Sequence, residues 1–222
     1  MRILVTGANG LVGQGVLKAC LGDPGVEQVV ALGRHHNGTS HAKFSELIVA
    51  DFSELGDIEP RLQPFDACLY CAGAPPIGTA EDSYRHVTLE LTMHVAKTLA
   101  RLNPSMTFVY VSGANSNPTS RIMPLRIKGE TEVALAALPI RTIMFRTGGV
   151  QPVDGVRSPH KMMDRMYRGV GPLMGLGVRM MPGLMTNTAR VGRAMLAVLR
   201  TPDAPAVLEN AAINRMGKFA ND

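Results

Sequence analysis

The stretch RILVTGANGLVGQGV, residues 2–16, decides the fold. An apolar, β-branched run leads into Gly7, Gly10 and Gly13, and a run with helical spacing follows. A strand, a glycine turn and a helix in this order form the first unit of a dinucleotide-binding fold. Gly7 permits the tight turn, Gly10 lets the backbone approach a pyrophosphate, and Gly13 lets the helix pack closely on the strand. We therefore expect phosphates at the helix N-terminus, where free N–H groups and the positive end of the dipole lie.

The rest of the chain alternates short apolar runs with helical stretches. The apolar runs are nearly continuous, which is typical of a parallel sheet buried on both faces. The alternation predicts an α/β fold with a doubly wound, mostly parallel Rossmann sheet and helices on both faces. We expect strands at 2–6, 27–33, 46–51, 66–72, 106–112 and 140–146, and helices at 11–21, 80–102 and 122–138.

The composition changes after Arg146. Residues 147–186 are rich in Gly, Pro and Met, and a short helix is expected at 159–168. A clearer helix begins near 186–188, where Thr and Asn side chains can cap it, and a last strand is expected at 206–213. We interpret residues 1–222 as a single domain, in which residues 147–222 form a small C-terminal cap on the substrate side.

The totals exclude several classes of protein. The 222 residues, 45% of them hydrophobic, are enough for one core. The sequence has no run of 18 consecutive apolar residues, so we expect no stable membrane insertion. The opening MRILVTG lacks the pattern of a signal peptide, and three cysteines make no disulfide framework, so we expect a cytoplasmic protein. Cys68 and Cys71 form a C-x-x-C within an expected strand, where they point to opposite faces, so no metal site is expected.

The charge is unevenly distributed. Residues 1–120 carry 8 Lys/Arg against 11 Asp/Glu, whereas residues 121–222 carry 15 against 7. The positive residues are scattered singly, which argues against nucleic acid and leaves a phosphorylated ligand as the better explanation. A membrane surface meeting the Met-rich segment 160–185 is a weaker alternative, because few amphipathic turns are visible there. The methionines are most simply irregular core filling, and an adaptable apolar substrate pocket is the alternative.

The second expected strand ends in ALGRHH, which bears on the choice of nucleotide. NAD-binding folds place an acid at this point to bind the ribose 2′-OH, whereas a nearby arginine accommodates a 2′-phosphate. Here Arg34 takes the place of the acid, and His35 follows it. This favours NADP(H) over NAD(H), although an ordinary solvated arginine is the alternative.

The segment TGANGLVG resembles the TGxxGxxG opening of short-chain dehydrogenase/reductase (SDR) proteins. The resemblance is strongest to the extended and atypical branches, which include the NAD-dependent epimerase/dehydratase-like proteins, and it covers at least residues 1–150. The stretches VADFSEL, YCAGAP, VYVSGAN, IKGETE and FRTGGVQP follow in the order of that family.

The resemblance implies a role for individual residues. Asp51 would bind the adenine amine, Ser112 and Lys128 would be the candidate catalytic residues, and Arg146 and Gly148 would lie near the nicotinamide. Each has a structural alternative: Asp51 as a turn cap, Ser112 bonded to backbone, Lys128 paired with Glu132. The cofactor-binding residues expected in this way are Gly7, Asn9, Gly10, Leu11, Val12, Gly13, Arg34, Asp51, Phe52, Cys71, Ala72, Gly73, Ser112, Lys128, Arg146 and Gly148.

The chain departs from the family at the proton donor. SDR enzymes carry a tyrosine four residues before the lysine, and here that position is Pro124, which has no proton to transfer. The position two after Ser112 is Ala114, and Ser116 is a possible substitute. Tyr84 and Tyr167 are the tyrosines outside the expected strands.

Two hypotheses of function remain. The first is an NADP(H)-dependent oxidoreductase or epimerase-like enzyme that acts on a small, apolar substrate with an unusual proton donor. The second is a non-catalytic NADP(H)-binding sensor or regulatory protein. The resemblance also implies a possible homodimer, formed through the helices that flank the fourth and fifth strands. Both hypotheses are compatible with such a dimer.

Overall fold

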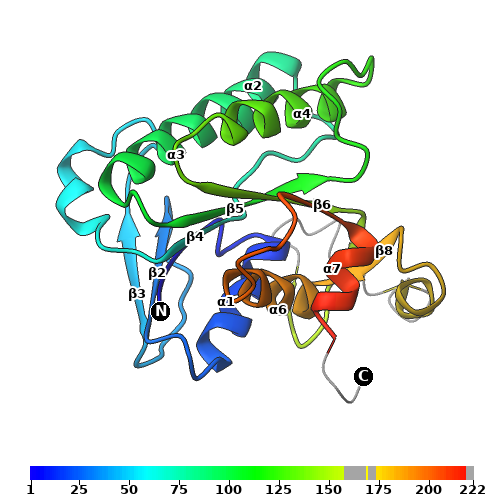
Figure 1. Cartoon of the computed structure of the whole chain (residues 1–222), viewed down its shortest axis with the longest axis horizontal. Helices are drawn as coiled ribbons and strands as arrows, with labels where there is room; N and C mark the ends of the chain where they lie inside the picture. The colour runs from blue at the N-terminus through cyan, green and yellow to red at the C-terminus, as the bar shows by residue number, and fades with distance from the viewer. Residues whose placement is uncertain (158–168, 170–173, 219–222) are drawn as a thin grey trace.

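A seven-stranded parallel sheet forms the centre of the protein (Figure 1). The computed structural model describes residues 1–157, 169 and 174–218. The strand order is β3-β2-β1-β4-β5-β6-β9, and a separate pair, β7-β8, is also parallel. The strands are β1 (Arg2–Thr6), β2 (Gln28–Gly33), β3 (Phe44–Ile48), β4 (Ala67–Tyr70), β5 (Thr107–Gly113), β6 (Arg141–Thr147), β7 (Gly149–Gln151), β8 (Met185–Asn187) and β9 (Val207–Glu209).

Helices cover both faces of the sheet, as the alternating pattern predicts (Figure 1). One layer holds α1, α6 and α7, and the other holds α2, α3 and α4. The doubly wound α/β fold expected from the sequence is therefore confirmed. The helical elements are α1 (Leu11–Gly22), the 3-10 turn η1 (Gly56–Arg61), α2 (Glu81–Arg85), the π-helical turn η2 (His86–Glu90), α3 (Leu91–Leu102), α4 (Met123–Ala136), α6 (Thr188–Leu199) and α7 (Asn210–Met216).

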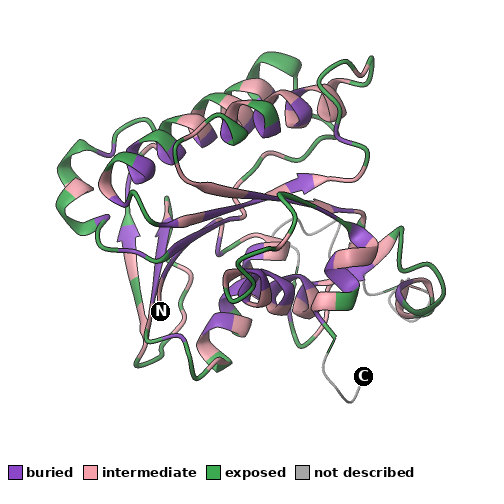
Figure 2. Ribbon diagram, viewed as in Figure 1, coloured by how far each residue is buried: buried purple, intermediate pink, exposed green. Residues whose placement is uncertain are grey.

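Two apolar cores lie on opposite sides of the sheet, and the strands supply both. Ile3 and Val5 of β1 pack into the core beneath α1 and α6, whereas Leu4 packs into the core beneath α3 and α4. Figure 2 shows the buried residues gathered on the strands and on the helix surfaces that face them. Burial on both faces explains why the strands are continuous apolar runs rather than alternating ones.

The order of the strands places a crevice at one edge of the sheet. The chain runs outward from β1 in both directions, to β2 and β3 on one side and to β4, β5 and β6 on the other. Thr6, at the end of β1, is paired with Leu32 on one side and Tyr70 on the other. In open α/β sheets, ligands bind beyond the carboxyl ends of the strands at such a switch point.

Two expected strands differ from the structure. The third was expected at 46–51 but ends at Ile48, because β2 ends at Gly33 and Val49 makes the last bond to it. The last was expected at 206–213, and this is wrong beyond Glu209: the chain enters α7 at Asn210. Two alanines follow Asn210, and alanine favours a helix.

Within residues 147–222, β9 joins the main sheet and α6 joins one of its helix layers, and the role of this segment as a cap stays a prediction. β9 pairs with β6, and α6 packs against α1 through Gly192, which lies against Gly15 and Val16. The helix that begins near 186–188 is confirmed as α6, and Asn187 caps it by accepting a bond from the Arg190 N–H. The helix expected at 159–168 lies outside the described residues.

Candidate functional site

The glycine turn after β1 is fixed by its own backbone. Gly7 has a φ of +66°, a conformation that L side chains rarely adopt. A Cβ at this position would lie 2.6 Å from the Cys71 carbonyl carbon and 2.6 Å from the Ala72 nitrogen. The Gly10 N–H closes the turn by donating to the Gly7 carbonyl at 2.8 Å. The turn and the segment after β4 therefore approach as closely as they do because residue 7 has no side chain.

The next two glycines shape the start of α1. A Cβ on Gly13 would lie 2.0 Å from the Gly7 carbonyl oxygen, and one on Gly10 would lie 3.2 Å from the same atom. Gly10 is the N-cap of α1, and among the described residues no side chain caps this end and no acid lies in the first turn. The first N–H groups of α1 are thus available to an anion.

A cavity lies beside this turn, at the carboxyl ends of β1, β2 and β4. Segments far apart in sequence line it: the glycine turn, the ends of β2 and β3, and the segment after β4. Nine residues expected at the cofactor from the sequence line it: Gly7, Asn9, Gly10, Arg34, Asp51, Phe52, Cys71, Ala72 and Gly73.

Sequence reasoning missed other lining residues. Glu46, Ile48, Val87 and Leu91 belong to this group, and only the register of β3 and the path of the helix after β4 place them there. Seven expected residues do not line the cavity: Leu11, Val12, Gly13, Ser112, Lys128, Arg146 and Gly148.

A positive and a negative side chain line the part of the cavity at the ends of β2 and β3. Arg34 is exposed and directly follows β2. Glu46 on β3 is the neighbouring acid, and both of its oxygens are engaged: Oε2 lies 2.8 Å from His36 Nδ1, and Oε1 accepts from the Asn37 N–H at 2.9 Å. Asn9 Nδ2 donates to the His35 carbonyl at 3.1 Å and so ties the glycine turn to this loop.

Asp51 lines the same cavity and also caps the turn that follows it. Its Oδ1 accepts from the Ser53 N–H at 2.7 Å and from the Ser53 hydroxyl at 2.6 Å. These bonds from Ser53 lower the pKa of Asp51 below its usual value. The carboxylate therefore stays ionised. Asp51 caps the turn and also lines the cavity, so the two positions are compatible.

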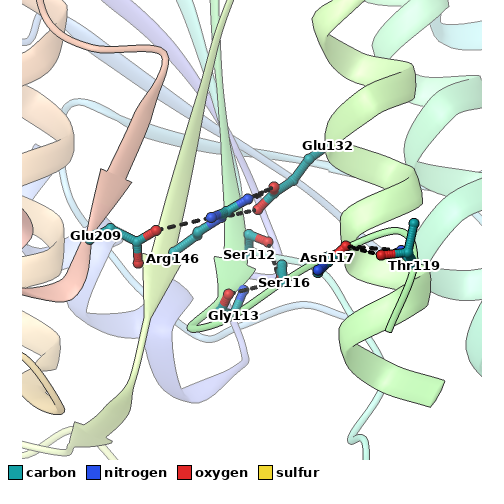
Figure 3. A network of polar contacts seen from close by, with 8 residues as sticks. All are labelled: Ser112, Gly113, Ser116, Asn117, Thr119, Glu132, Arg146 and Glu209. Atoms are coloured by element: carbon teal, nitrogen blue, oxygen red, sulfur yellow. Dashed lines mark hydrogen bonds and ion pairs between the residues drawn. The ribbon is translucent and has the colours of Figure 1, made fainter. Parts of the chain in front are cut away.

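A pair of serine hydroxyls lies at the end of β5 (Figure 3). Ser112 and Ser116 are buried, and their oxygens are 3.0 Å apart. Ser116 Oγ also donates to the Gly113 carbonyl at 2.7 Å. Since Ser116 has a single proton and directs it to that carbonyl, Ser112 is the donor between the two hydroxyls. Ser116 thereby orients Ser112.

Lys128 projects from α4 toward β5 rather than toward Glu132. Its Nζ donates to the Val111 carbonyl at 3.0 Å and lies 5.4 Å from the centre of the Tyr110 ring. Burial lowers the pKa of Lys128 to about 8, and the negative charge of Glu132 opposes that shift. Lys128 is thus held beside the strand that carries Ser112.

Glu132 is instead held by Arg146 (Figure 3). Arg146 Nε lies 3.0 Å from Oε1 of Glu132, and Nη2 lies 2.6 Å from Oε2. Arg146 Nη1 lies 3.0 Å from a carboxylate oxygen of Glu209. The hydrogen bonds that Arg146 donates to Glu132 and Glu209 raise the pKa of Arg146. Arg146 therefore links α4, β6 and β9, and its place at the cofactor stays a prediction.

Gly148 is required by a backbone contact. A Cβ there would lie 2.1 Å from the Leu184 carbonyl oxygen, and its N–H donates to Asn210 Oδ1 at 2.9 Å. The structure explains this glycine through packing, so its expected place near the nicotinamide also stays a prediction.

The described tyrosines are all buried. Burial raises the pKa of Tyr70, Tyr84 and Tyr110. Tyr70 lines the cavity, whereas Tyr84 and Tyr110 do not, and Tyr167 lies outside the described residues. Pro124 occupies the first turn of α4, where a proline costs the helix no hydrogen bond. Of the described tyrosines, Tyr70 alone therefore lines this cavity, and the family's proton-donor position in the sequence is a proline.

The part of the chain that the structure describes also bears on metal and membrane sites. Cys68, on β4, and Cys71, directly after it, contact opposite cores. No group of three His, Cys, Asp or Glu side chains able to hold a metal ion occurs there. Within the same residues, no helix is both long and apolar enough to cross a membrane.

Comparison with known proteins identifies the class. Residues 3–132 match the NAD dependent epimerase/dehydratase family. The match covers more than half of the chain, so the protein belongs to this family, as the resemblance in its sequence implies.

Two curated proteins are similar to the chain. "Leucinostatins biosynthesis cluster protein T" of Purpureocillium lilacinum is 27% identical over 165 residues, which are 71% of this chain and 61% of that protein. "Protein FMP52, mitochondrial" of Kluyveromyces lactis is 30% identical over 155 residues, 68% of this chain and 67% of that one. The chain thus spans about three-fifths of the first relative and two-thirds of the second.

Solved structures share the fold. MoeE5 in complex with UDP-glucose and NAD superposes with a TM-score of 0.68 at 18% identity, covering 93% of this chain and 74% of that one. UDP-glucuronic acid 4-epimerase from Bacillus cereus, in complex with NAD, gives 0.65 at 17% identity, covering 91% and 74%. At this identity the likeness is one of fold.

Proposed function

We propose that the protein binds NADP(H) in the cavity beside the glycine turn and that it is an SDR-type oxidoreductase or epimerase-like enzyme. The observation that carries the proposal is the convergence of nine residues, chosen from sequence alone, on one cavity at the switch point of the sheet. The NAD bound in the structures of MoeE5 and of the Bacillus cereus epimerase supports a nicotinamide dinucleotide.

The residues present fit such a cofactor. The uncapped N-terminus of α1 and the bare backbone at Gly10 suit a pyrophosphate. In this proposal Asp51 and Phe52 hold the adenine, and the segment Cys71–Gly73 lies along the cofactor. The cofactor, when bound, supplies or accepts a hydride. Ser112 would orient a substrate oxygen, and Lys128 would bind the nicotinamide ribose.

The preference for NADP(H) rests on the charges at the end of β2. Arg34 lies in the cavity, and its guanidinium can pair with a 2′-phosphate. Glu46, the acid on the neighbouring strand, already has both oxygens engaged by His36 and Asn37. Both oxygens of Glu46 are thus held by its own loop, whereas Arg34 lines the cavity and can meet the ligand.

Titration of the purified protein with NADPH and NADH tests this. We expect tighter binding of NADPH, and Arg34→Ala should reduce the difference by on the order of tenfold. The matched control is Arg61→Ala, which removes an exposed arginine outside the cavity and should change neither affinity. Equal affinities in the wild type would refute the role of Arg34, and binding of neither nucleotide would refute the dinucleotide site.

Turnover is the second part of the proposal. The substrate is expected to be small and apolar, and the proton donor differs from the family's tyrosine, because Pro124 stands in its place. Lys128 and Ser112 remain the candidate catalytic residues. Oxidation of NADPH with a panel of small apolar carbonyl compounds tests this, with Lys128→Met and Ser112→Ala as inactive variants.

A non-catalytic sensor is the second candidate function. It is favoured by one observation, that every described tyrosine is buried and none occupies the donor position. Such a protein would bind NADPH with full affinity and oxidise none of it with any compound of the panel. A cytoplasmic location, a homodimer and the division of residues 1–222 into one domain with a cap at 147–222 stay predictions.

A further inference from the structure

A second cavity, far from the glycine turn in sequence, is lined by positive charge. It lies where residues 174–180, the start of α6 and the chain after α7 meet; α7 and α6 can be followed in Figure 1. Arg179, Arg190 and Lys218 line it together with Gln151 and Asn187. Among the described residues, no acid lines this cavity. All three cations belong to residues 121–222, the half of the chain that carries the basic excess.

The framework around this cavity is well fixed. Gln151 and Asn187 are register partners on β7 and β8. The Asn187 side chain accepts from the Arg190 N–H at 2.8 Å, which places Arg190 in the first turn of α6. A Cβ on Gly217 would lie 2.2 Å from the Arg190 carbonyl oxygen, so the close approach of α7 to α6 brings Lys218 to the same place.

Residues 174–184, which we call the lobe beside this cavity, also carry exposed apolar side chains. Leu176 is 51% exposed, Met180 is 70% exposed and Leu184 is 59% exposed. Leu176 and Met180 are four residues apart in a helical segment and therefore share a face, and Arg179 directly precedes Met180. Of the nine large hydrophobic side chains exposed in the described residues, four lie between positions 176 and 184. Such a concentration marks an interaction surface.

We propose that this lobe docks on an anionic membrane surface, with a phospholipid phosphate in the basic cavity and Leu176, Met180 and Leu184 in contact with the acyl boundary. Positive charge beside exposed apolar side chains is the combination that anionic bilayers attract. A free phosphate in solution would use the cations alone and would leave the apolar side chains without a partner. The contact is peripheral and is independent of the dinucleotide site.

Flotation of the protein with vesicles tests the proposal, with and without saturating NADPH. One set of vesicles is phosphatidylcholine alone, and the other is an equimolar mixture with phosphatidylglycerol. We expect binding to the anionic vesicles only, and loss of that binding in high salt, because salt screens exposed charges. Binding should be the same with and without NADPH.

Two double variants separate the contributions. Arg179→Gln with Lys218→Gln should weaken vesicle binding by on the order of fivefold for each cation removed. Leu176→Ser with Met180→Ser should weaken it while leaving its salt dependence intact. The controls are Arg121→Gln and Val133→Ser, which change an exposed arginine and an exposed valine elsewhere. All four replace surface side chains, so each should unfold at the wild-type temperature.

Three outcomes would overturn the proposal. The first is no binding to anionic vesicles by the wild type. The second is binding that neither double variant weakens more than the controls do. The third is binding of inorganic pyrophosphate, lost in the arginine–lysine variant, without any binding of vesicles; this would assign the cavity to a soluble phosphate ligand instead.

Discussion

Arg146 is expected to be a strong determinant of stability, and Arg146→Met tests this. The side chain of Glu132 is only 8% exposed, and Arg146 donates two close bonds to its carboxylate. Removal of the guanidinium would leave a buried carboxylate without its partner. Breaking a buried pair in this way costs about 3–5 kcal/mol of unfolding free energy.

The matched control uses the other carboxylate of the same arginine. Glu209 is 58% exposed, so Glu209→Gln should cost less than about 1 kcal/mol. The double variant Arg146→Met with Glu132→Met should recover most of the loss, because no buried charge then remains.

Urea denaturation followed by circular dichroism provides the free energies of unfolding of the wild type and the three variants. The reasoning is refuted if Arg146→Met costs no more than Glu209→Gln, since Glu132 would then find solvent or another partner. It is also refuted if the double variant is less stable than Arg146→Met.

Two further predictions concern α1 and Lys128. Gly13→Ala places a Cβ 2.0 Å from the Gly7 carbonyl oxygen and should cost about 3 kcal/mol, whereas Gly22→Ala, with no atom within 4 Å, should cost nothing; equal effects in thermal unfolding would contradict the packing argument. Burial lowers the pKa of Lys128 from 10.5 to about 8. Between these pH values the lysine is protonated in the unfolded chain but neutral in the folded one, so its contribution to stability rises with pH across that window. Lys128→Met should therefore gain stability relative to the wild type below pH 8 and lose this advantage toward pH 10.5, and a difference independent of pH would show that the ammonium is solvated.

The sequence was sufficient for the fold because local and global signals agree. The glycine turn requires bare backbone at positions 7 and 13, and the structure shows backbone atoms where side chains would otherwise be. The buried strands are apolar on both faces, so their positions were visible without any knowledge of the partner strands. The prediction made the last strand too long, because AVLENAAI is apolar enough for a strand or a helix. Only the end of β6 decides where the pairing stops.

The candidate site was predictable only where a residue belongs to a local motif. Arg34 directly follows β2 and was found from that position, whereas Asp51 was found from its place in the stretch VADFSEL that resembles the family. Glu46 was missed because its place in the cavity depends on the register of β3 against β2. Arg146 was assigned to the cofactor, and no pattern in the sequence announces its bonds to Glu132 and Glu209, which are 14 and 63 residues away.

A crystal structure of the protein with NADPH tests the central claim most directly. The account predicts the pyrophosphate at the N-terminus of α1 beside Gly10, the 2′-phosphate in contact with Arg34, and the adenine beside Asp51. A nucleotide bound elsewhere, or a 2′-phosphate directed away from Arg34 into solvent, would contradict it.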